Sequence, residues 1–391
     1  MLKVRDSTII LVTHFLIYSA SQALRDYLIQ DKVNTLFFIS HPLPQIDANK
    51  KEYSFVQVYE KGFPVKRLTS KKKFTGLLLP VITHFFLTIY WSLHVKKKAD
   101  VFIGIDNVNA VAGILLKWFG RVRKVVYYTI DYFPTRYENP ILNWAYHALD
   151  KFCVRYSDET WNVSPQMVSA RKIHNLVHGK AFGKQFTVPI GIWYEKAPRK
   201  EYDPKRRFIL TFVGHLVKHM GVDLVIRSLP QLIKEFPSIK LEVIGGGEEL
   251  DNLKHLVKDK GVERNVRFYG WVKNRSRVER LLSTGGIGLA TFNTDILDDK
   301  VKNADPAKIK DYMLLGLPVI ATNAIANWQE IQQKRCGIIA KYSEKSFIKA
   351  VERLVKNEET YRRYRSHALD YVKQFDYNVL FSGNVKRILK K

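Results

Sequence analysis

The chain has 391 residues. A single hydrophobic core usually supports a shorter chain than this, so we expect two domains. Its hydrophobic fraction of 46% and charged fraction of 26% are typical of folded globular proteins and exclude a disordered chain. Its two cysteines, Cys153 and Cys336, exclude a disulfide-stabilised scaffold and favour the reducing cytoplasm.

The formal net charge is +27, and the basic excess extends over both halves of the chain. A field of this sign attracts anions, whether nucleotide phosphates, anionic lipids or nucleic acids. The sequence holds no helix-turn-helix, RNA-recognition or zinc-finger pattern, so we expect no nucleic-acid partner. A basic nucleic-acid-binding protein stays the weaker alternative.

From the N-terminus onward, short apolar runs alternate with amphipathic stretches. We interpret Thr8–Thr13 as a buried first strand and not as the core of a signal peptide, because Asp6 and His14 interrupt the apolar run. Most of the runs lack a two-residue alternation, which is typical of parallel strands covered on both faces. The other strands predicted in the first half are Thr35–Ile39, Ser54–Val58, Val101–Ile105, Val125–Tyr128 and Glu159–Val163, and its predicted helices are Ser21–Gln30, Asn109–Phe119 and Pro140–Tyr156.

A break at Val188–Gly191, followed by the charged stretch Glu195–Arg207, predicts a domain boundary. We expect a first domain over residues 1–192, a second over 193–375, and a C-terminal helix over 376–391 that packs back on the first. The second domain repeats the pattern with predicted strands Phe208–Val213, Lys240–Ile244, Val266–Tyr269, Ile287–Thr291 and Pro318–Ala321, and helices Val222–Glu235, Glu248–Lys260, Arg275–Leu282 and Pro306–Leu315. This alternation predicts an α/β fold of two Rossmann-like, doubly wound domains facing each other across a cleft, with ligands at the carboxyl ends of the strands.

The first loop at such an end runs from Gly214 to Gly221, between a predicted strand and a predicted helix. Glycines let a backbone approach a phosphate, and the loop offers amide donors and positive charge. Lys218 is the best candidate for a charge on a diphosphate. The alternative is that Gly214 and Gly221 serve only the turn and the helix entry.

Two further segments of the second domain carry related signals. Gly245-Gly246-Gly247 follows the next strand, lacks the spacing of the dinucleotide fingerprint, and is interpreted as a glycine-lined wall beside a nucleotide. Pro306 and Gly316 delimit a short helix before a buried strand. Asp311 on this helix could accept hydrogen bonds from ribose hydroxyls, and the free amides at its start could meet a diphosphate.

The segment from Pro306 to Ala321 resembles the signature P-x-K-x-x-E-Y-M-x-x-G-x-P-V-I-A of family 4 glycosyltransferases of the GT-B fold, with Asp311 in the Glu place. The glycine-plus-basic loop, Gly270-Trp271-Val272 and Asp158–Ser164 resemble the same family. The resemblance covers most of the chain from about residue 100 and is most specific in the second domain.

The resemblance implies a donor-binding second domain and an acceptor-side first domain. Asp311 would bind the ribose of a UDP- or GDP-sugar, and Val272 would contact the base. It also implies retention of anomeric configuration, no obligatory cofactor and no metal. The catalytic candidates are Lys218, His215 and Asp131, and the donor-binding candidates are Gly214, Gly245, Gly246, Val272, Asn303, Pro306, Lys308 and Asp311.

Three departures from the family pattern affect these assignments. The family often has Arg or another residue at His215 and a lysine at Met220, and Lys218 lies two residues before that lysine position. Asn303 stands where the family has a second acid, eight residues before Asp311. In the first domain, Ile130 takes the place of a histidine and leaves Asp131 as the functional group. The acidic residues Asp295, Asp298 and Asp299 match no metal-ligand spacing and are interpreted as a solvated loop.

The acceptor-side candidates are Ser21 and Gln22 after the first strand, and Asp106 and Asn107 after a later one. The alternative is that these polar residues only cap helices.

Residues 71–98 place an apolar stretch, long enough on paper to span a bilayer, between two triple-lysine runs. Because it falls between strands of one sheet and contains Pro80 and His84, we favour a helix lying in the interface of an anionic membrane, with a fully buried helix as the alternative. The sequence thus predicts a cytoplasmic hexosyltransferase, peripheral on the inner face of the plasma membrane. It would transfer a sugar to a glycan or lipid-linked acceptor of the cell envelope. A sugar-nucleotide epimerase of the same fold is the alternative enzyme.

Overall fold

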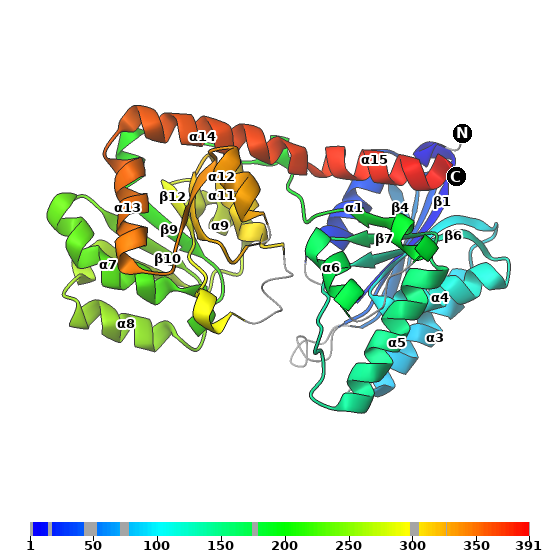
Figure 1. Cartoon of the computed structure of the whole chain (residues 1–391). Helices are drawn as coiled ribbons and strands as arrows, with labels where there is room; N and C mark the ends of the chain where they lie inside the picture. Colours follow the sequence, from blue (N-terminus) through cyan, green and yellow to red (C-terminus); the bar gives the residue numbers. More distant parts are fainter. Residues whose placement is uncertain are drawn as a thin grey trace. The chain divides into compact units, whose positions relative to one another are not determined.

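The computed structural model of the chain describes residues 3–14, 18–42, 53–70, 78–173, 179–297, 305–325 and 327–390. The chain divides into two compact units (Figure 1). The N-terminal unit comprises residues 1–190 and 377–391, and the C-terminal unit comprises residues 191–376. The division falls within two residues of the boundary expected from the sequence, and the last helix joins the N-terminal unit.

The N-terminal unit contains an eight-stranded sheet in the order β4-β3-β2-β1-β5-β6-β7-β8. Its strands are β1 (Thr8–Thr13), β2 (Thr35–Ser40), β3 (Phe55–Glu60), β4 (Phe63–Thr69), β5 (Ala99–Ile105), β6 (Val122–Thr129), β7 (Glu159–Asn162) and β8 (Gln185–Thr187). The first strand, β1, pairs in parallel with β2 and β5 in the middle of the sheet.

One edge of this sheet differs from the expectation of parallel strands. β3 pairs antiparallel with β2, and β4 pairs antiparallel with β3. Only Lys61 and Gly62 connect β3 to β4, a link too short for the crossover that a parallel pair requires. Every residue of β4 is exposed, so the sequence offered no buried apolar run there.

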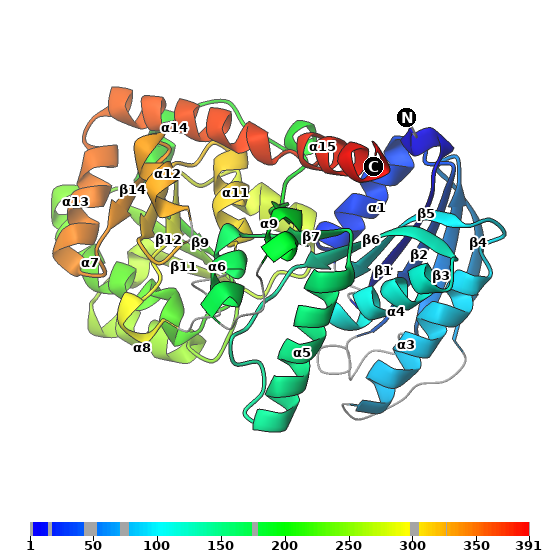
Figure 2. The same cartoon turned by 45° about the vertical axis from the view of Figure 1, so that its right-hand side comes forward.

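Helices cover both faces of the N-terminal sheet (Figure 2). They are α1 (Ala20–Gln30), α3 (Leu78–Leu93), α4 (Asn107–Trp118), α5 (Pro140–Tyr156), α6 (Pro165–Ile173) and α15 (Tyr377–Lys390). α3, α4 and α5 pack their apolar residues into the core on one face. α1 and α15 lie together on the other, with the rings of Tyr27 and Phe381 5.8 Å apart. Arg387 ties α15 to Glu159 of β7 at 2.8 Å.

The C-terminal unit contains a six-stranded, wholly parallel sheet in the order β11-β10-β9-β12-β13-β14. Its strands are β9 (Ile209–Val213), β10 (Lys240–Ile244), β11 (Val266–Gly270), β12 (Ile287–Ala290), β13 (Val319–Thr322) and β14 (Gly337–Ala340). Numbered within the unit, this is the Rossmann order 3-2-1-4-5-6.

Two layers of helices bury this sheet. The helices are α7 (Val222–Glu235), α8 (Leu250–Asp259), α9 (Arg275–Leu282), α11 (Ala307–Leu314), α12 (Trp328–Gln333), α13 (Glu344–Val355) and α14 (Glu358–Val372). α7, α8 and α13 form one core with the sheet, and α9, α11 and α12 form a second core on its other face. Each unit is therefore a three-layer α/β domain.

Helix α3 carries two contrasting faces. His84, Thr88 and Trp91 are buried against the N-terminal unit. The opposite face exposes the apolar side chains of Leu79, Ile82, Phe86, Tyr90 and Leu93. Within the described ranges, no helix combines the length and apolar character that crossing a membrane requires.

Candidate functional site

The strand order of the C-terminal sheet reverses between β9 and β12. The connections that leave these two strands therefore turn to opposite faces, and ligands in doubly wound folds bind outside the carboxyl ends at this switch point. The loop Gly214–Gly221 follows β9, and the chain from Thr291 follows β12. These two loops and the helix that lies over them, α11, form the candidate donor site.

The glycine loops after β9 and β10 form one wall, joined backbone to backbone. Gly214 and Gly245 have φ angles of +145° and +154°, which glycine adopts far more readily than other residues. A Cβ on Gly245 would lie 1.9 Å from the carbonyl oxygen of Gly214. The N–H of Leu216 donates to the carbonyl oxygen of Gly246 at 2.9 Å. No side chain fits between the two loops, as a glycine-lined wall requires.

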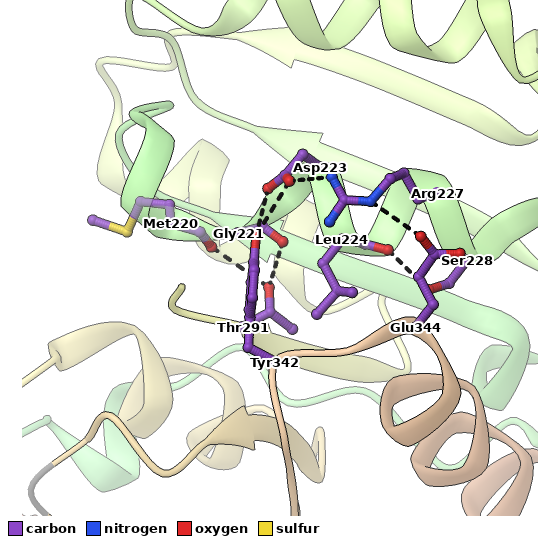
Figure 3. Close-up of polar contacts among 9 residues, drawn as sticks. All are labelled: Met220, Gly221, Asp223, Leu224, Arg227, Ser228, Thr291, Tyr342 and Glu344. Carbon is purple, nitrogen blue, oxygen red and sulfur yellow. Dashed lines mark hydrogen bonds and ion pairs between the residues drawn. The ribbon is translucent and has the colours of Figure 1, made fainter. Parts of the chain in front are cut away.

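Polar contacts at the start of α7 hold the far end of this loop (Figure 3). Thr291 donates its hydroxyl to the carbonyl oxygen of Gly221 at 3.0 Å. Asp223 accepts hydrogen bonds from the Tyr342 hydroxyl at 2.9 Å and from Arg227 at 2.5 Å. The loop after β9 is thereby fixed to the chain that follows β12 and to the chain that follows β14.

Gly221→Ala is expected to destabilise the C-terminal unit. Gly221 has a φ of +66°, and a Cβ there would lie 1.8 Å from the Thr291 carbonyl oxygen, so the backbone must shift. Strain of this kind costs about 1–3 kcal/mol of the free energy of unfolding, measured by urea denaturation. Gly383→Ala in α15 is the control, because its Cβ meets no atom within 4 Å and alanine favours a helix. Equal losses in both variants would contradict this account.

Tyr312 fixes α11 over the strand ends. Its hydroxyl accepts from the N–H of Val213 at 2.8 Å and donates to the carbonyl oxygen of Leu289 at 3.1 Å. Gly288 leaves room for the ring, since a Cβ there would lie 2.3 Å from it. The helix is therefore held to both strands of the switch point, β9 and β12.

Asp311 lies on α11 and is mostly buried. Arg275, at the start of α9, donates to its two carboxylate oxygens at 2.5 and 3.0 Å. A carboxylate offers about four acceptor positions, so two stay open for hydroxyl donors while the arginine fixes its orientation. The sequence pattern identified Asp311 but missed Arg275, because nothing local links two residues that are 36 positions apart.

Lys308, one turn before Asp311, reaches the glycine wall. Its Nζ would lie 3.1 Å from a Cβ on Gly214, and it lies 3.4 Å from the sulfur of Met220. Burial lowers the pKa of Lys308 to about 7. Within the described part of the chain, no carboxylate pairs with it. The structure thus brings Lys308, Gly214 and Gly245 together.

The other donor-side candidates lie at the edge of this group. His215 and Lys218 are exposed, and Lys218 begins a single 3-10 turn, Lys218–Met220. Gly246 lies beside Trp271: a Cβ added to Gly246 would be 3.5 Å from the Cβ of Trp271. Val272 packs against the core of the α9 and α11 face.

Pro306 is the N-cap residue of α11. Asn303 lies outside the described residues, as do Asp298 and Asp299 of the acidic loop.

The N-terminal sheet has its own switch point, between β1 and β5. Asp106 follows β5 with φ +69° and ψ 164°, a combination nearly restricted to glycine. Burial raises the pKa of Asp106 to about 7; the Arg136 guanidinium opposes this rise and the Asp131 carboxylate adds to it. Backbone strain and a carboxyl that titrates near neutrality both concentrate at functional sites.

His14 follows β1, on the other side of this switch point. Its Nδ1 accepts from the Asn109 amide at 3.0 Å, and the same amide nitrogen donates to the Ile105 carbonyl oxygen at 2.7 Å. Burial, with the charges of His84 and Arg136, lowers the pKa of His14 to about 3, so the ring is neutral and its proton is on Nε2.

This Nε2–H donor and the Oδ1 acceptor of Asn109 are both buried, and neither has a hydrogen-bond partner among the described residues. A buried unpaired donor and a buried unpaired acceptor on two contacting side chains could each be satisfied by a ligand that bears hydroxyl groups. Two more histidines lie beside His14. The rings of His41 and His84 stack at 4.6 Å, and both nitrogens of His41 are bonded to hydroxyls within the fold. The rule that selected Asp106, a polar residue directly after a buried strand, would also have found His14 and His41.

The remaining acceptor-side candidates have partners in helix starts. The Oε1 of Gln22 accepts from the N–H of Ser19 and from the hydroxyl of Ser21, both at 2.9 Å, at the beginning of α1. Asn107, the first residue of α4, accepts from the N–H of Val108 at 2.8 Å. Of these bonds, the one from the Ser19 N–H to Gln22 belongs to a capping box, as the capping alternative requires, whereas α4 has no side-chain cap. Asp131 lies two residues after the end of β6; desolvation raises the pKa of its carboxyl, and the Arg136 guanidinium opposes this rise.

Residues 194–370, within the C-terminal unit, match the family model of glycosyl transferases group 1. Over 151 residues the chain is 26% identical to an uncharacterised glycosyltransferase of Haemophilus influenzae, a match that covers 38% of this chain and 40% of that protein. Over 70 residues it is 34% identical to a GDP-mannose-dependent alpha-(1-6)-phosphatidylinositol monomannoside mannosyltransferase of Mycolicibacterium smegmatis, a match that covers 18% of each.

The whole chain is similar in fold to Anabaena HepE, whose crystal structure contains UDP. The TM-score is 0.70 at 14% identity, and the alignment covers 98% of this chain and 100% of HepE. The similarity shows the GT-B fold of two Rossmann-like domains that the sequence predicted. The match to the glycosyl transferases group 1 model covers less than half of the chain and lies wholly within the second of these domains.

Proposed function

We propose that the protein is a glycosyltransferase whose C-terminal unit binds a nucleoside diphosphate sugar. The observation that carries the proposal is the position of Lys308 against the joined glycine wall, with Asp311 one turn further along the same helix and held by Arg275. Both residues lie inside the segment that matches the group 1 family. Asp311 binds the ribose hydroxyls, and the wall of Gly214, Gly245 and Gly246 admits the diphosphate.

The base lies beside Val272, and the exposed His215 and Lys218 complete the rim of the site. Two relatives indicate the donors to test first: HepE was crystallised with UDP, and the Mycolicibacterium relative is GDP-mannose-dependent. UDP- and GDP-sugars are therefore the proposed substrates.

The acceptor binds in the N-terminal unit, at the switch point between β1 and β5. His14 and Asn109 offer one donor and one acceptor to a hydroxyl-bearing ligand. The Asp106 carboxylate orients the attacking hydroxyl, with Asp131 nearby. Retention of anomeric configuration is the outcome that the family resemblance favours.

A panel of UDP-, GDP- and ADP-sugars, each incubated with a membrane lipid extract, tests the activity. We expect one donor to raise the melting temperature and to release nucleoside diphosphate only when the extract is present. Nuclear magnetic resonance of the product would show its anomeric configuration. Isomerisation of the sugar nucleotide without transfer would contradict the proposal.

Asp106→Asn is expected to raise the free energy of unfolding at pH 8 while it abolishes transfer. A carboxyl whose folded pKa lies near 7 instead of its usual value near 4 favours the folded state only when protonated, so stability falls as pH rises between these values. Asparagine resembles the protonated acid and removes this loss. Urea denaturation at pH 5 and pH 8 measures the effect. The gain should be larger at pH 8, and an equal gain at both would contradict the raised pKa.

The exposed apolar face of α3 supports a further proposal, that the acceptor is lipid-linked and the protein binds an anionic membrane surface. Three exposed lysines, residues 96–98, follow this helix closely. An apolar face with lysines at its end suits the interface of a bilayer that contains anionic lipid. The Mycolicibacterium relative is named as a phosphatidylinositol monomannoside mannosyltransferase.

Phe86→Ser is expected to weaken binding to phosphatidylglycerol vesicles by about 10- to 100-fold, because one buried phenylalanine contributes about 1.5–3 kcal/mol. Co-sedimentation measures the bound fraction. Phe63→Ser is the matched control, an exposed phenylalanine on β4. Equal binding by wild type and Phe86→Ser would contradict insertion of this face.

A further inference from the structure

The charge of Lys308 is not neutralised by the part of the chain that the structure describes. Its ammonium group lies 3.4 Å from the Met220 sulfur and 4.4 and 5.0 Å from the ring centres of Phe212 and Phe292. A thioether and two aromatic rings offset only part of the cost of removing an ammonium from water. This position therefore holds a cation that lacks an anion.

Two nearby lysines, by contrast, each have a carboxylate partner or contact with solvent. Lys310, on the same helix, is buried and forms an ion pair with Asp305. Lys218, on the glycine loop, is exposed and solvated. Lys310 is thus paired with a carboxylate, and Lys218 is hydrated by solvent. Lys308 instead faces Gly214.

We propose that Lys308, and not Lys218, supplies the positive charge that holds the diphosphate of the sugar nucleotide and stabilises it as it leaves. This inference rests on the proposed function. Lys308 reaches the wall from α11, a helix that Tyr312 anchors to β9 and β12. Gly214 keeps the approach open, because a side chain there would meet the ammonium at 3.1 Å.

The charge acts where the reaction creates negative charge. The bond between the anomeric carbon and the diphosphate oxygen breaks, and its electron pair stays on the diphosphate. The acceptor oxygen forms the new bond to that carbon, and its proton leaves with the diphosphate. A fixed ammonium beside the leaving group stabilises this transition state more than the ground state.

Calorimetric titration of the full chain at pH 7, with UDP, GDP and the two nucleosides, tests the assignment. Lys308→Met is expected to bind the diphosphate about 10- to 100-fold more weakly, with nucleoside affinity unchanged. Lys218→Met is the matched control and should lose less than about fivefold. In Lys308→Met/Met220→Lys the two side chains are exchanged, and because their ends lie 3.4 Å apart, most of the affinity should return.

The pH dependence is a second readout. The neutral fraction of Lys308 grows above pH 7, so diphosphate affinity of the wild type should fall there by up to about tenfold per unit, a trend that Lys308→Met should lose. The other titratable groups on the adjacent loop are His215, Lys218 and His219, and the Lys218→Met titration measured over the same range separates that lysine from Lys308.

The outcomes separate the inference from the proposed function. If the wild type binds a nucleoside diphosphate and Lys308→Met binds it equally well, or Lys218→Met loses more, Lys308 is not the diphosphate cation and the function stands. If Lys308→Met loses nucleoside affinity to the same degree, its role is structural and the inference fails. If the wild type binds neither UDP nor GDP, the proposed function itself fails.

Discussion

Asp311→Ala is expected to weaken binding of the donor nucleotide by about 10- to 100-fold, since hydrogen bonds to a charged group contribute about 1.5–3 kcal/mol. Asp311 keeps two acceptor positions open beside Arg275, and ribose offers two adjacent hydroxyls to fill them. The measurement is calorimetric titration with the nucleoside diphosphate that binds the wild type. Asp311→Glu, the residue that the family signature has in this place, should retain most of the affinity.

A second ligand makes the test of Asp311 specific. The 2′-deoxy nucleotide should bind the wild type more weakly than the ribonucleotide, because it lacks one of the two hydroxyls. In Asp311→Ala the two ligands should bind alike, which a general loss of structure would not produce. An unchanged preference for the ribonucleotide in the variant would place the ribose elsewhere.

Asp150→Ala is expected to cost about 3–5 kcal/mol of the free energy of unfolding of the N-terminal unit, because it leaves Arg171 as an unpaired buried charge. Both side chains are fully buried, and two hydrogen bonds of 2.8 and 2.9 Å join them. Arg171 also binds Thr129 at the end of β6 and Asn162 at the end of β7. The pair thereby holds two strand ends of the acceptor side.

Urea denaturation monitored by tryptophan fluorescence measures this loss. Arg5→Ala is the control in the same unit, since Arg5 is 67% exposed and lies 4.0 Å from Asp31, so its loss should cost less than about 1 kcal/mol. The double variant Asp150→Leu/Arg171→Met should be more stable than Asp150→Ala, because it removes both charges. A double variant less stable than Asp150→Ala would contradict this reason.

The parallel cores were predictable because their strands and helices are defined locally. Lys240–Ile244, Pro140–Tyr156, Val222–Glu235 and Arg275–Leu282 match the structure residue for residue. An apolar run or a helical period needs no knowledge of distant residues. The exposed β4 lacked that signal, since its pairing with β3 depends on a two-residue turn and not on burial.

From the sequence, the residues of the candidate site were predictable only where they lie at strand ends or next to glycine-rich loops. Asp311 and Lys308 came from a pattern of neighbouring residues, but the orientation of Lys308 toward Gly214 depends on how α11 packs over β9. The hydrogen bond between His14 and Asn109 connects residues that are 95 positions apart in the sequence. Contacts between residues so far apart in the sequence depend on the order of the strands in the sheet. A pattern of neighbouring residues does not predict that order.

Hydrogen–deuterium exchange of the full chain, with and without the saturating nucleoside diphosphate chosen by the panel, tests the central claim most directly. We expect slower exchange in peptides that cover the loop Gly214–Gly221 and helix α11, because both would surround the bound diphosphate and ribose. Protection confined to the N-terminal unit, or none in these two segments at saturation, would contradict a donor site at the strand ends of the C-terminal unit.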